Sequence, residues 1–205
     1  MQLSEVQRDA LVELLNIGFG RAGASLSRLT NQRVLLEVPH VAVHPILELE
    51  KHLSSVIEDE VASVHQAFSG PVGGDALLIL DPVAAASLKE LLTNEPALPL
   101  VLDASSREVL TEVGNILLNA CLGTFGNLLK IPVSFTVPDI DIATLQTVVQ
   151  RLIGDEDGSF RYALVVTAGF RLRDAEVTGY VVMVLTVQSL TRLLVAVEGW
   201  ERSQH

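Results

Sequence analysis

The sequence predicts an α/β (α+β) fold in which two pseudo-symmetric halves, each with the element order α-β-α-β-β-α, pack long helices on β-sheet. An internal repeat is the first observation: residues 13–17 match residues 112–116 at an offset of 99, and the match continues without a gap into the next predicted strand. The second observation is that each half begins with a long stretch of helical periodicity, after which come short β-branched runs typical of strands. We therefore expect one compact domain over residues 1–205, built from repeats at about 1–100 and 101–205.

Composition limits the function classes. The chain is 49% apolar and only 4% aromatic, with a formal net charge of −11. That apolar content excludes a disordered chain, and 14 Lys and Arg against 25 Asp and Glu argue against nucleic-acid binding. Apolar runs such as 181–185 are far shorter than the roughly 20 residues of a membrane-spanning helix. A polar N-terminus, no basic face for a membrane and a single cysteine, Cys121, predict a cytoplasmic protein without a disulfide.

The elements of the first half follow from periodicity and from local start and stop signals. A capping box, Ser4 with Gln7, opens the long helix, and Asp81 with Pro82 opens the last one. We expect, in order, a helix 4–29, a strand 33–39, a weak helix 45–57, strands 61–69 and 76–80 joined by a turn at 70–74, and a helix 82–92.

The second half is predicted to repeat this order after a linker, 93–99, that contains two prolines. A capping box, Ser105 with Glu108, again opens the long helix. The expected elements are a helix 105–129, a strand 133–137, a helix 141–153, hairpin strands 160–172 and 176–186, and a closing helix 189–197. A three-stranded sheet in each half would leave an apolar face uncovered, so we expect the halves to cover one another across a pseudo-two-fold axis.

Each long helix carries a polar stripe, because residues three and four apart share a helix face. The stripes are Asp9, Glu13, Asn16 and Gly20 on the first helix and Glu108, Glu112, Asn115 and Asn119 on the second. A solvated face is the ordinary interpretation of a single Glu-x-x-Asn pair. Other exposed positions have diverged between the halves, Arg21 matching Ala120 for example. Conservation of both side chains in register therefore favours a functional site.

Three glycines, Gly18, Gly20 and Gly23, lie inside the first long helix, where each costs about 1 kcal/mol relative to alanine. Packing of the helix on the sheet would account for Gly18 and Gly23. Gly20 lies on the polar stripe, so close approach of a partner is the other hypothesis there.

A glutamate beside an asparagine suits only some chemistries. The pair contains no nucleophile, and no histidine stands beside it as a base, so Ser-His or Cys-His catalysis is disfavoured. One carboxylate and one amide make a poor metal site. The amide can hold a water in line for attack, as in phosphoryl hydrolysis, and the carboxylate can pair with a cation of a partner. Such a site works best when the phosphate and the metal belong to the partner.

At these residues the sequence resembles the CheC/CheX/FliY family of chemotaxis phosphatases. The family motif, Asp or Ser followed by Glu, Asn and Pro at set spacings, is matched in full by Asp9, Glu13, Asn16 and Pro39. The second half has Glu112, Asn115 and Pro138 at the same spacing, but Glu108 stands at the first position. Serving the capping box with Ser105 is the alternative role for Glu108.

The resemblance implies a CheC-like domain that hydrolyses the aspartyl phosphate of a phosphorylated CheY-like response regulator. Asn16 and Asn115 would orient the attacking water, and Glu13 and Glu112 would pair with a lysine of the receiver. The resemblance implies no cofactor on this chain, with Mg²⁺ bound by the receiver, and a CheD-type deamidase as a further partner. The alternative is a non-catalytic module that sequesters the phosphorylated receiver or the deamidase; retention of both pairs favours the enzyme.

Other candidate features have plainer interpretations. Cys121 is expected to be a buried small hydrophobe. His40 and His44 are flanked by prolines and are interpreted as loop residues. Residues 155–158 resemble the start of a calcium loop without its bidentate Glu, which favours an acidic turn, and 70–74 is a turn rather than a phosphate cradle.

Overall fold

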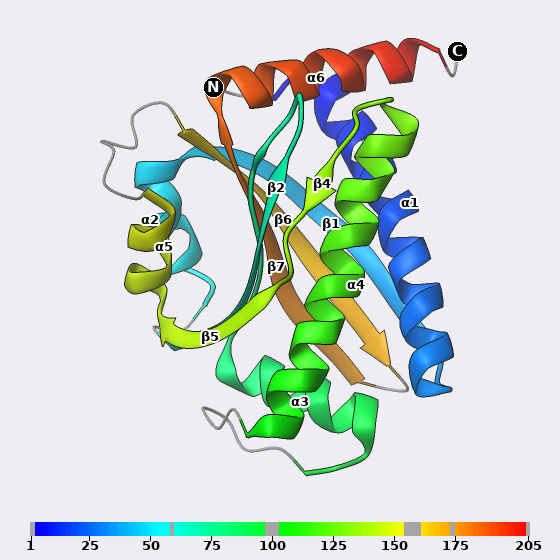
Figure 1. The fold of residues 1–205 in the computed structure, drawn as a ribbon, viewed down its shortest axis with the longest axis vertical. Helices are drawn as coiled ribbons and strands as arrows, with labels where there is room; N and C mark the ends of the chain where they lie inside the picture. The colour runs from blue at the N-terminus through cyan, green and yellow to red at the C-terminus, as the bar shows by residue number, and fades with distance from the viewer. Residues whose placement is uncertain (1–2, 58–59, 97–102, 154–160, 173–174, 204–205) are drawn as a thin grey trace.

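The computed structural model describes residues 3–57, 60–96, 103–153, 161–172 and 175–203 (Figure 1). The first half of the chain folds into two longer helices, a short one and three strands. These elements are α1 (Glu5–Thr30), β1 (Val34–Pro45), the 3-10 turn η1 (Ile46–Glu48), α2 (Leu49–Leu53), β2 (Glu60–Ser69), β3 (Gly74–Leu80) and α3 (Pro82–Thr93).

The second half follows the same order of elements, with its first strand divided in two. The elements are α4 (Ala104–Leu128), β4 (Ser134–Phe135), β5 (Asp139–Thr144), α5 (Leu145–Ile153), β6 (Arg161–Leu172), β7 (Ala175–Thr186) and α6 (Val187–Arg202). The mixed α/β fold class is confirmed. Residues 155–158, interpreted above as an acidic turn, lie outside the described residues.

The strands of both halves form one antiparallel sheet rather than two separate sheets. The strand order is β1-β6-β7-β3-β2-β4, and β5 also pairs with β2. The order is symmetric about the central β3·β7 pair. Counted outward from that pair, one side has β3, β2 and β5, and the other side has the corresponding strands β7, β6 and β1. The expectation of two three-stranded sheets was therefore wrong. The first strand of each half crosses over to pair with the second strand of the other half, which satisfies edges that separate sheets would leave open.

Helices cover both faces of this sheet. The long helices α1 and α4 lie side by side on one face, with α6 across one end of the pair and α3 at the other end, while α2 and α5 lie on the opposite face (Figure 1). Alternate residues of a strand point to opposite faces, so β3 sends Leu78 to the α1/α4 side and Leu77 and Ile79 to the α2/α5 side. The buried apolar residues thus form two hydrophobic cores, one on each face of the sheet.

The structure differs from the prediction in the first strand of each half. Residues 141–144, predicted to begin a helix, continue β5, because the alternating sequence 139–142 pairs with β2 between Ala62 and His65. The predicted strand 133–137 is reduced to the two residues of β4. In the first half, β1 extends to Pro45, so His40 and His44 are strand residues, and their interpretation as loop residues was wrong.

Two of the three predicted helix-start signals are confirmed, and the third is wrong. Ser4 and Gln7 form the expected capping box, and the Asp81 side chain accepts from the Ala84 N–H. Thr186 caps α6 one turn before the predicted start. The capping box of Ser105 with Glu108 was wrong: Asp103 is the N-cap of α4 and accepts from the Ser106 N–H at 2.7 Å, so Glu108 is free of a capping role.

Glycines allow the two long helices to approach their neighbours. A Cβ at Gly18 would lie 3.0 Å from the Ala120 carbonyl oxygen, so this glycine serves helix–helix contact and not, as predicted, packing on the sheet. Gly23 does face the sheet, 3.1 Å from the Val34 carbonyl oxygen. Gly114 has the same use on α4, against Val64 of β2.

Cys121 is buried in the α1/α4 core, as predicted, and burial raises the pKa of its thiol. Helix α4 is long and apolar enough to span a membrane, but half of its most apolar stretch is buried within the protein. Core helices of soluble proteins meet the same criterion.

Candidate functional site

The first predicted site, which we call site 1, consists of Asp9, Glu13 and Asn16. All three are exposed on one face of α1, opposite the buried stripe that holds Leu11 and Leu14. Asn16 lies about one turn after Glu13, so the amide and the carboxylate are neighbours on the helix surface.

The orientation of the Asn16 amide is fixed by the sheet. Its Oδ1 accepts a hydrogen bond from the backbone N–H of Val38 at 3.2 Å. Val38 lies in an irregularity of β1, where the pairing with β6 shifts register between Glu37 and His40. A bulge of this kind frees a backbone N–H from the ladder. Because Oδ1 faces the strand, the Nδ2 group is held on the solvent side of the amide.

This contact gives a physical reason for the spacing between Asn16 and Pro39. The register shift of β1 lies between Glu37 and His40, and the Val38 N–H within this stretch faces α1. Helix and strand are therefore joined at the residue next to the motif proline.

The second predicted site, site 2, consists of Glu108, Glu112 and Asn115 on α4. Both glutamates are exposed, whereas Asn115 is half-buried. The Oδ1 of Asn115 accepts from Nδ2 of Asn119, one turn further along, at 2.6 Å. Pro138 lies just before β5 and is half-buried. The structure thus places each motif on its own helix, with the carboxylate and the amide adjacent in both.

The two sites lie at opposite ends of the helix pair, because α1 and α4 run antiparallel (Figure 1). The C-terminal turn of α1 lies beside the first half of α4, where a mostly apolar groove of about 280 Å³ reaches Glu108 and Glu112. Leu29 on this groove is 62% exposed. The four motif carboxylates and amides therefore form two separate sites, and site 2 adjoins an apolar surface.

The amide network around site 2 contains a residue that the sequence reading missed. Nε2 of Gln66 on β2 donates to Oδ1 of Asn119 at 3.2 Å and to the carbonyl oxygen of Thr136 at 2.8 Å. Gln66 is 1% exposed. The sequence contains a signal for this residue, a polar side chain at a core-facing strand position. Gln66 interrupts the alternation of apolar residues on β2, where Val64 and Phe68 are both in the core.

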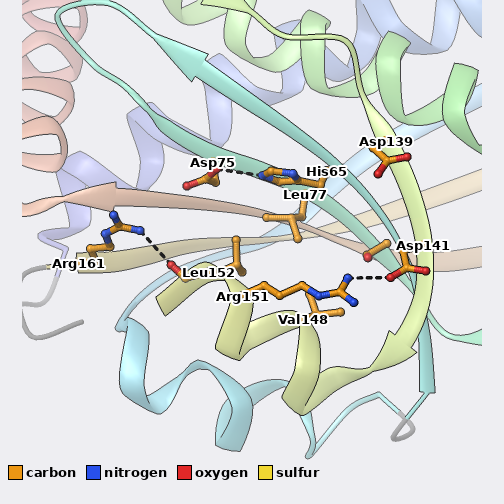
Figure 2. Close-up of a pocket in the computed structure, with 10 residues that line it drawn as sticks. His65, Asp75, Leu77, Asp139, Asp141, Val148, Arg151, Leu152 and Arg161 are labelled. Carbon is orange, nitrogen blue, oxygen red and sulfur yellow. Dashed lines mark hydrogen bonds and ion pairs between the residues drawn. The ribbon is translucent and has the colours of Figure 1, made fainter. Parts of the chain in front are cut away.

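A different pocket, of about 330 Å³, lies on the opposite face of the sheet, under α5 (Figure 2). Two charged pairs line it: His65 contacts Asp75 at 2.9 Å, and Arg151 binds Asp141 at 2.7 Å. No residue of either predicted site lines this pocket. Among the described residues, no group of three or more His, Cys, Asp and Glu is arranged to hold a metal ion.

Comparison with known proteins identifies the relatives of this fold. No protein-family model matches the sequence. The chain is 25% identical to the CheY-P phosphatase CheC of Bacillus subtilis over 199 residues, which cover 95% of each chain. It is 31% identical to the flagellar motor switch phosphatase FliY of the same organism over 90 residues, which cover 44% of this chain and 23% of FliY.

Solved structures show the same fold. The crystal structure of Thermotoga maritima FliY matches with a TM-score of 0.77, 17% identity and full coverage of both chains. The middle domain of FliM from H. pylori matches with a TM-score of 0.65 and 10% identity over 95% of this chain and 99% of that one. These structures show that the chain has the fold of FliY and of the FliM middle domain. The chain is therefore homologous to B. subtilis CheC along nearly its whole length, and part of it is homologous to FliY.

Proposed function

We propose that this protein hydrolyses the aspartyl phosphate of a CheY-like response regulator, using Asn16 in site 1 and Asn115 in site 2. The observation that carries the proposal is that both sites present a side-chain amide with its oxygen fixed internally, next to an exposed glutamate on a long helix. Homology to a CheY-P phosphatase over 95% of the chain supports the same activity.

The chemistry requires positioning more than reactive groups. The oxygen of a water attacks phosphorus, the bond from phosphorus to the receiver's aspartate oxygen breaks, and that aspartate leaves as a carboxylate. Asn16 or Asn115, inserted at the receiver's active site, holds the water in line, and a preorganised amide loses little entropy in doing so. A Mg²⁺ ion held by the receiver would stabilise the charge of the phosphoryl group. The receiver supplies that metal, and this chain supplies the amide.

Glu13 and Glu112 have a docking role in this proposal. Each is exposed one turn before its asparagine and would pair with a lysine of the receiver. The chain carries a net charge of −11, and Asp9 and Glu108 add to the negative charge at the two sites. Such a surface speeds the approach of a partner whose docking face is positive. The proposal places the protein in the cytoplasm, where response regulators act, with a CheD-type deamidase as a further partner.

The test is phosphate release from a phosphorylated CheY-like receiver with Mg²⁺, measured with and without the protein. We expect the double variant Asn16→Ala, Asn115→Ala to lose the acceleration while retaining its circular dichroism spectrum. Asn127→Ala, an exposed asparagine on α4 outside both sites, is the matched control and should keep full activity. Full activity of the double variant would contradict the site assignment.

The same experiment separates the enzyme from a binding module. A module that only sequesters the phosphorylated receiver or a deamidase would bind the receiver without changing its rate of phosphate loss at saturating protein. That outcome, with binding demonstrated by fluorescence anisotropy of a labelled receiver, would replace the enzyme hypothesis with the binding one.

A further inference from the structure

We infer that Gln66 and Asn119 are positioning residues for Asn115, and that the carbonyl group of Thr136 sets the orientation of the site 2 amide through them. The kinetic consequence rests on the phosphatase activity proposed above, but the orientation itself does not. In site 1 the amide oxygen is held by the backbone N–H of Val38 instead, so the two sites depend on different residues.

The direction of each hydrogen bond in this network follows from the Thr136 carbonyl group, which is its last member. The Thr136 carbonyl oxygen can only accept, so the Gln66 atom 2.8 Å from it is the donor Nε2. The same Nε2 also lies 3.2 Å from Asn119, which must present its acceptor Oδ1 there. Asn119 then turns its donor Nδ2 toward Asn115, 2.6 Å from Oδ1. A flip of any one amide would set two donors or two acceptors against each other.

Burial makes this arrangement costly to disturb. Gln66 is 1% exposed, and its Oε1 finds no hydrogen-bond partner among the described residues. A buried amide oxygen without a partner loses its hydration and gains no hydrogen bond in return. Stability alone would favour an apolar residue at this strand position, between Val64 and Phe68. The two hydrogen bonds that its Nε2 donates give the glutamine a positioning role at this strand position.

The first half shows what the site is like without this network. The offset of 99 that relates the long helices matches Asn119 with Gly20, and the offset of 102 that relates Phe68 to Phe170 matches Gln66 with Ala168. Neither residue carries an amide. Asn16 binds the Val38 N–H directly instead. Val137, at the position that corresponds to Val38, is 88% exposed.

The consequence is that site 2 should fail when Gln66 or Asn119 is replaced, although Gln66 is buried beneath the helix and Asn119 lies one turn beyond Asn115. An unanchored Asn115 would still allow docking through Glu112, but its amide would sample several rotamers. A misplacement of about 1 Å lowers the rate by about 100-fold at worst. The change should appear in kcat and leave KM within about twofold, in contrast to loss of a docking residue.

The experiment uses the full chain in an Asn16→Ala background, so that only site 2 operates. We expect Gln66→Leu and Asn119→Gly each to lower kcat about 10- to 100-fold with KM almost unchanged. Asn119→Gly introduces the residue found in site 1 and removes no core packing, so it remains informative where Gln66→Leu is unstable. Gln146→Leu, an exposed glutamine on α5, is the matched control and should retain kcat.

Side-chain amide NMR provides a readout independent of catalysis. The Asn115 Nδ2 resonances, assigned by their loss in Asn115→Ala, should report an ordered amide in the parent chain and a mobile one in both variants. An ordered Asn115 amide in folded Gln66→Leu and Asn119→Gly would overturn the inference. Unchanged kcat in both would also overturn it. If the parent chain lacked phosphatase activity, the proposed function would fail while the NMR result still decided the positioning role.

Discussion

The side chain of Asn16 on α1 accepts a hydrogen bond from the backbone N–H of Val38 on β1, over 3.2 Å. These residues are 22 positions apart in sequence, and the bond crosses from helix to sheet at the register shift between Glu37 and His40. The spacing of the motif is therefore a tertiary contact: the asparagine and the strand residue beside the proline belong to one hydrogen bond.

Replacement of Pro39 by alanine should impair site 1 selectively. Alanine adds a backbone N–H and relaxes the restriction on the bulge, so the Val38 N–H becomes free to return to the ladder. We expect kcat to fall by about 10-fold in an Asn115→Ala background, where only site 1 operates. Pro138→Ala in the same background is the control, since it alters a site already disabled. An equal fall in both variants would indicate general unfolding.

Glu13→Gln and Glu112→Gln should weaken docking at their own sites. A charge-assisted hydrogen bond to a lysine contributes about 1.5 kcal/mol or more, so KM should rise by about 10-fold when the other site is disabled. The rate should also become less sensitive to salt, because an ion pair is screened. Glu90→Gln, an exposed glutamate on α3, should leave KM and its salt dependence unchanged. Loss of kcat alone would argue that the glutamates act in the chemical step.

Gly20→Ala and Gly114→Ala should have opposite effects on stability. No described atom outside the helix backbone lies within 4 Å of a Cβ built at Gly20, so alanine there should raise the free energy of unfolding by up to about 1 kcal/mol through helix propensity. A Cβ at Gly114 would lie 2.5 Å from Cγ1 of Val64, and that substitution should lower it by about 1–3 kcal/mol. Urea unfolding of both variants measures the difference.

Gly20→Ala also tests whether a partner approaches the bare helix surface beside Asn16. We expect site 1 activity to fall even though the protein becomes more stable. Unchanged activity in an Asn115→Ala background would contradict the partner-approach hypothesis. Gly20 would then only lower the stability of the helix, without a role in binding.

His44 should make the protein less stable in mild acid. Its ring lies 3.7 Å from that of His52, and burial, followed by the nearby charge of His52, lowers the pKa of His44 below the usual 6.5. The unfolded chain then binds a proton at a higher pH than the folded one, so stability is complete above pH 6.5 and declines as the pH falls toward the folded-state pKa. The urea midpoint should fall between pH 7.5 and 5.5 by less in His44→Gln than in the parent chain. An equal fall in both would assign the effect to other groups.

The sequence by itself determined the features that depend on local spacing and on repetition. Helical periodicity predicted α1 and α4, and Ser4 and Asp81 marked two helix starts, because caps and helix faces depend on residues within a few positions of one another. The offset of 99 residues predicted the repeated order of elements, and the Glu-x-x-Asn spacing placed Glu13 beside Asn16 and Glu112 beside Asn115.

Only the tertiary structure decided how those local features are joined. The two halves share one sheet because β1 pairs with β6 and β5 with β2, and pairing between distant strands has no local signature in the sequence. The hydrogen bonds that orient Asn16 and Asn115 come from Val38 and from Asn119 with Gln66, and all but Asn119 are far away along the chain. Sequence spacing selects which side chains share a helix face; the packing of helix on sheet determines which way their amides point.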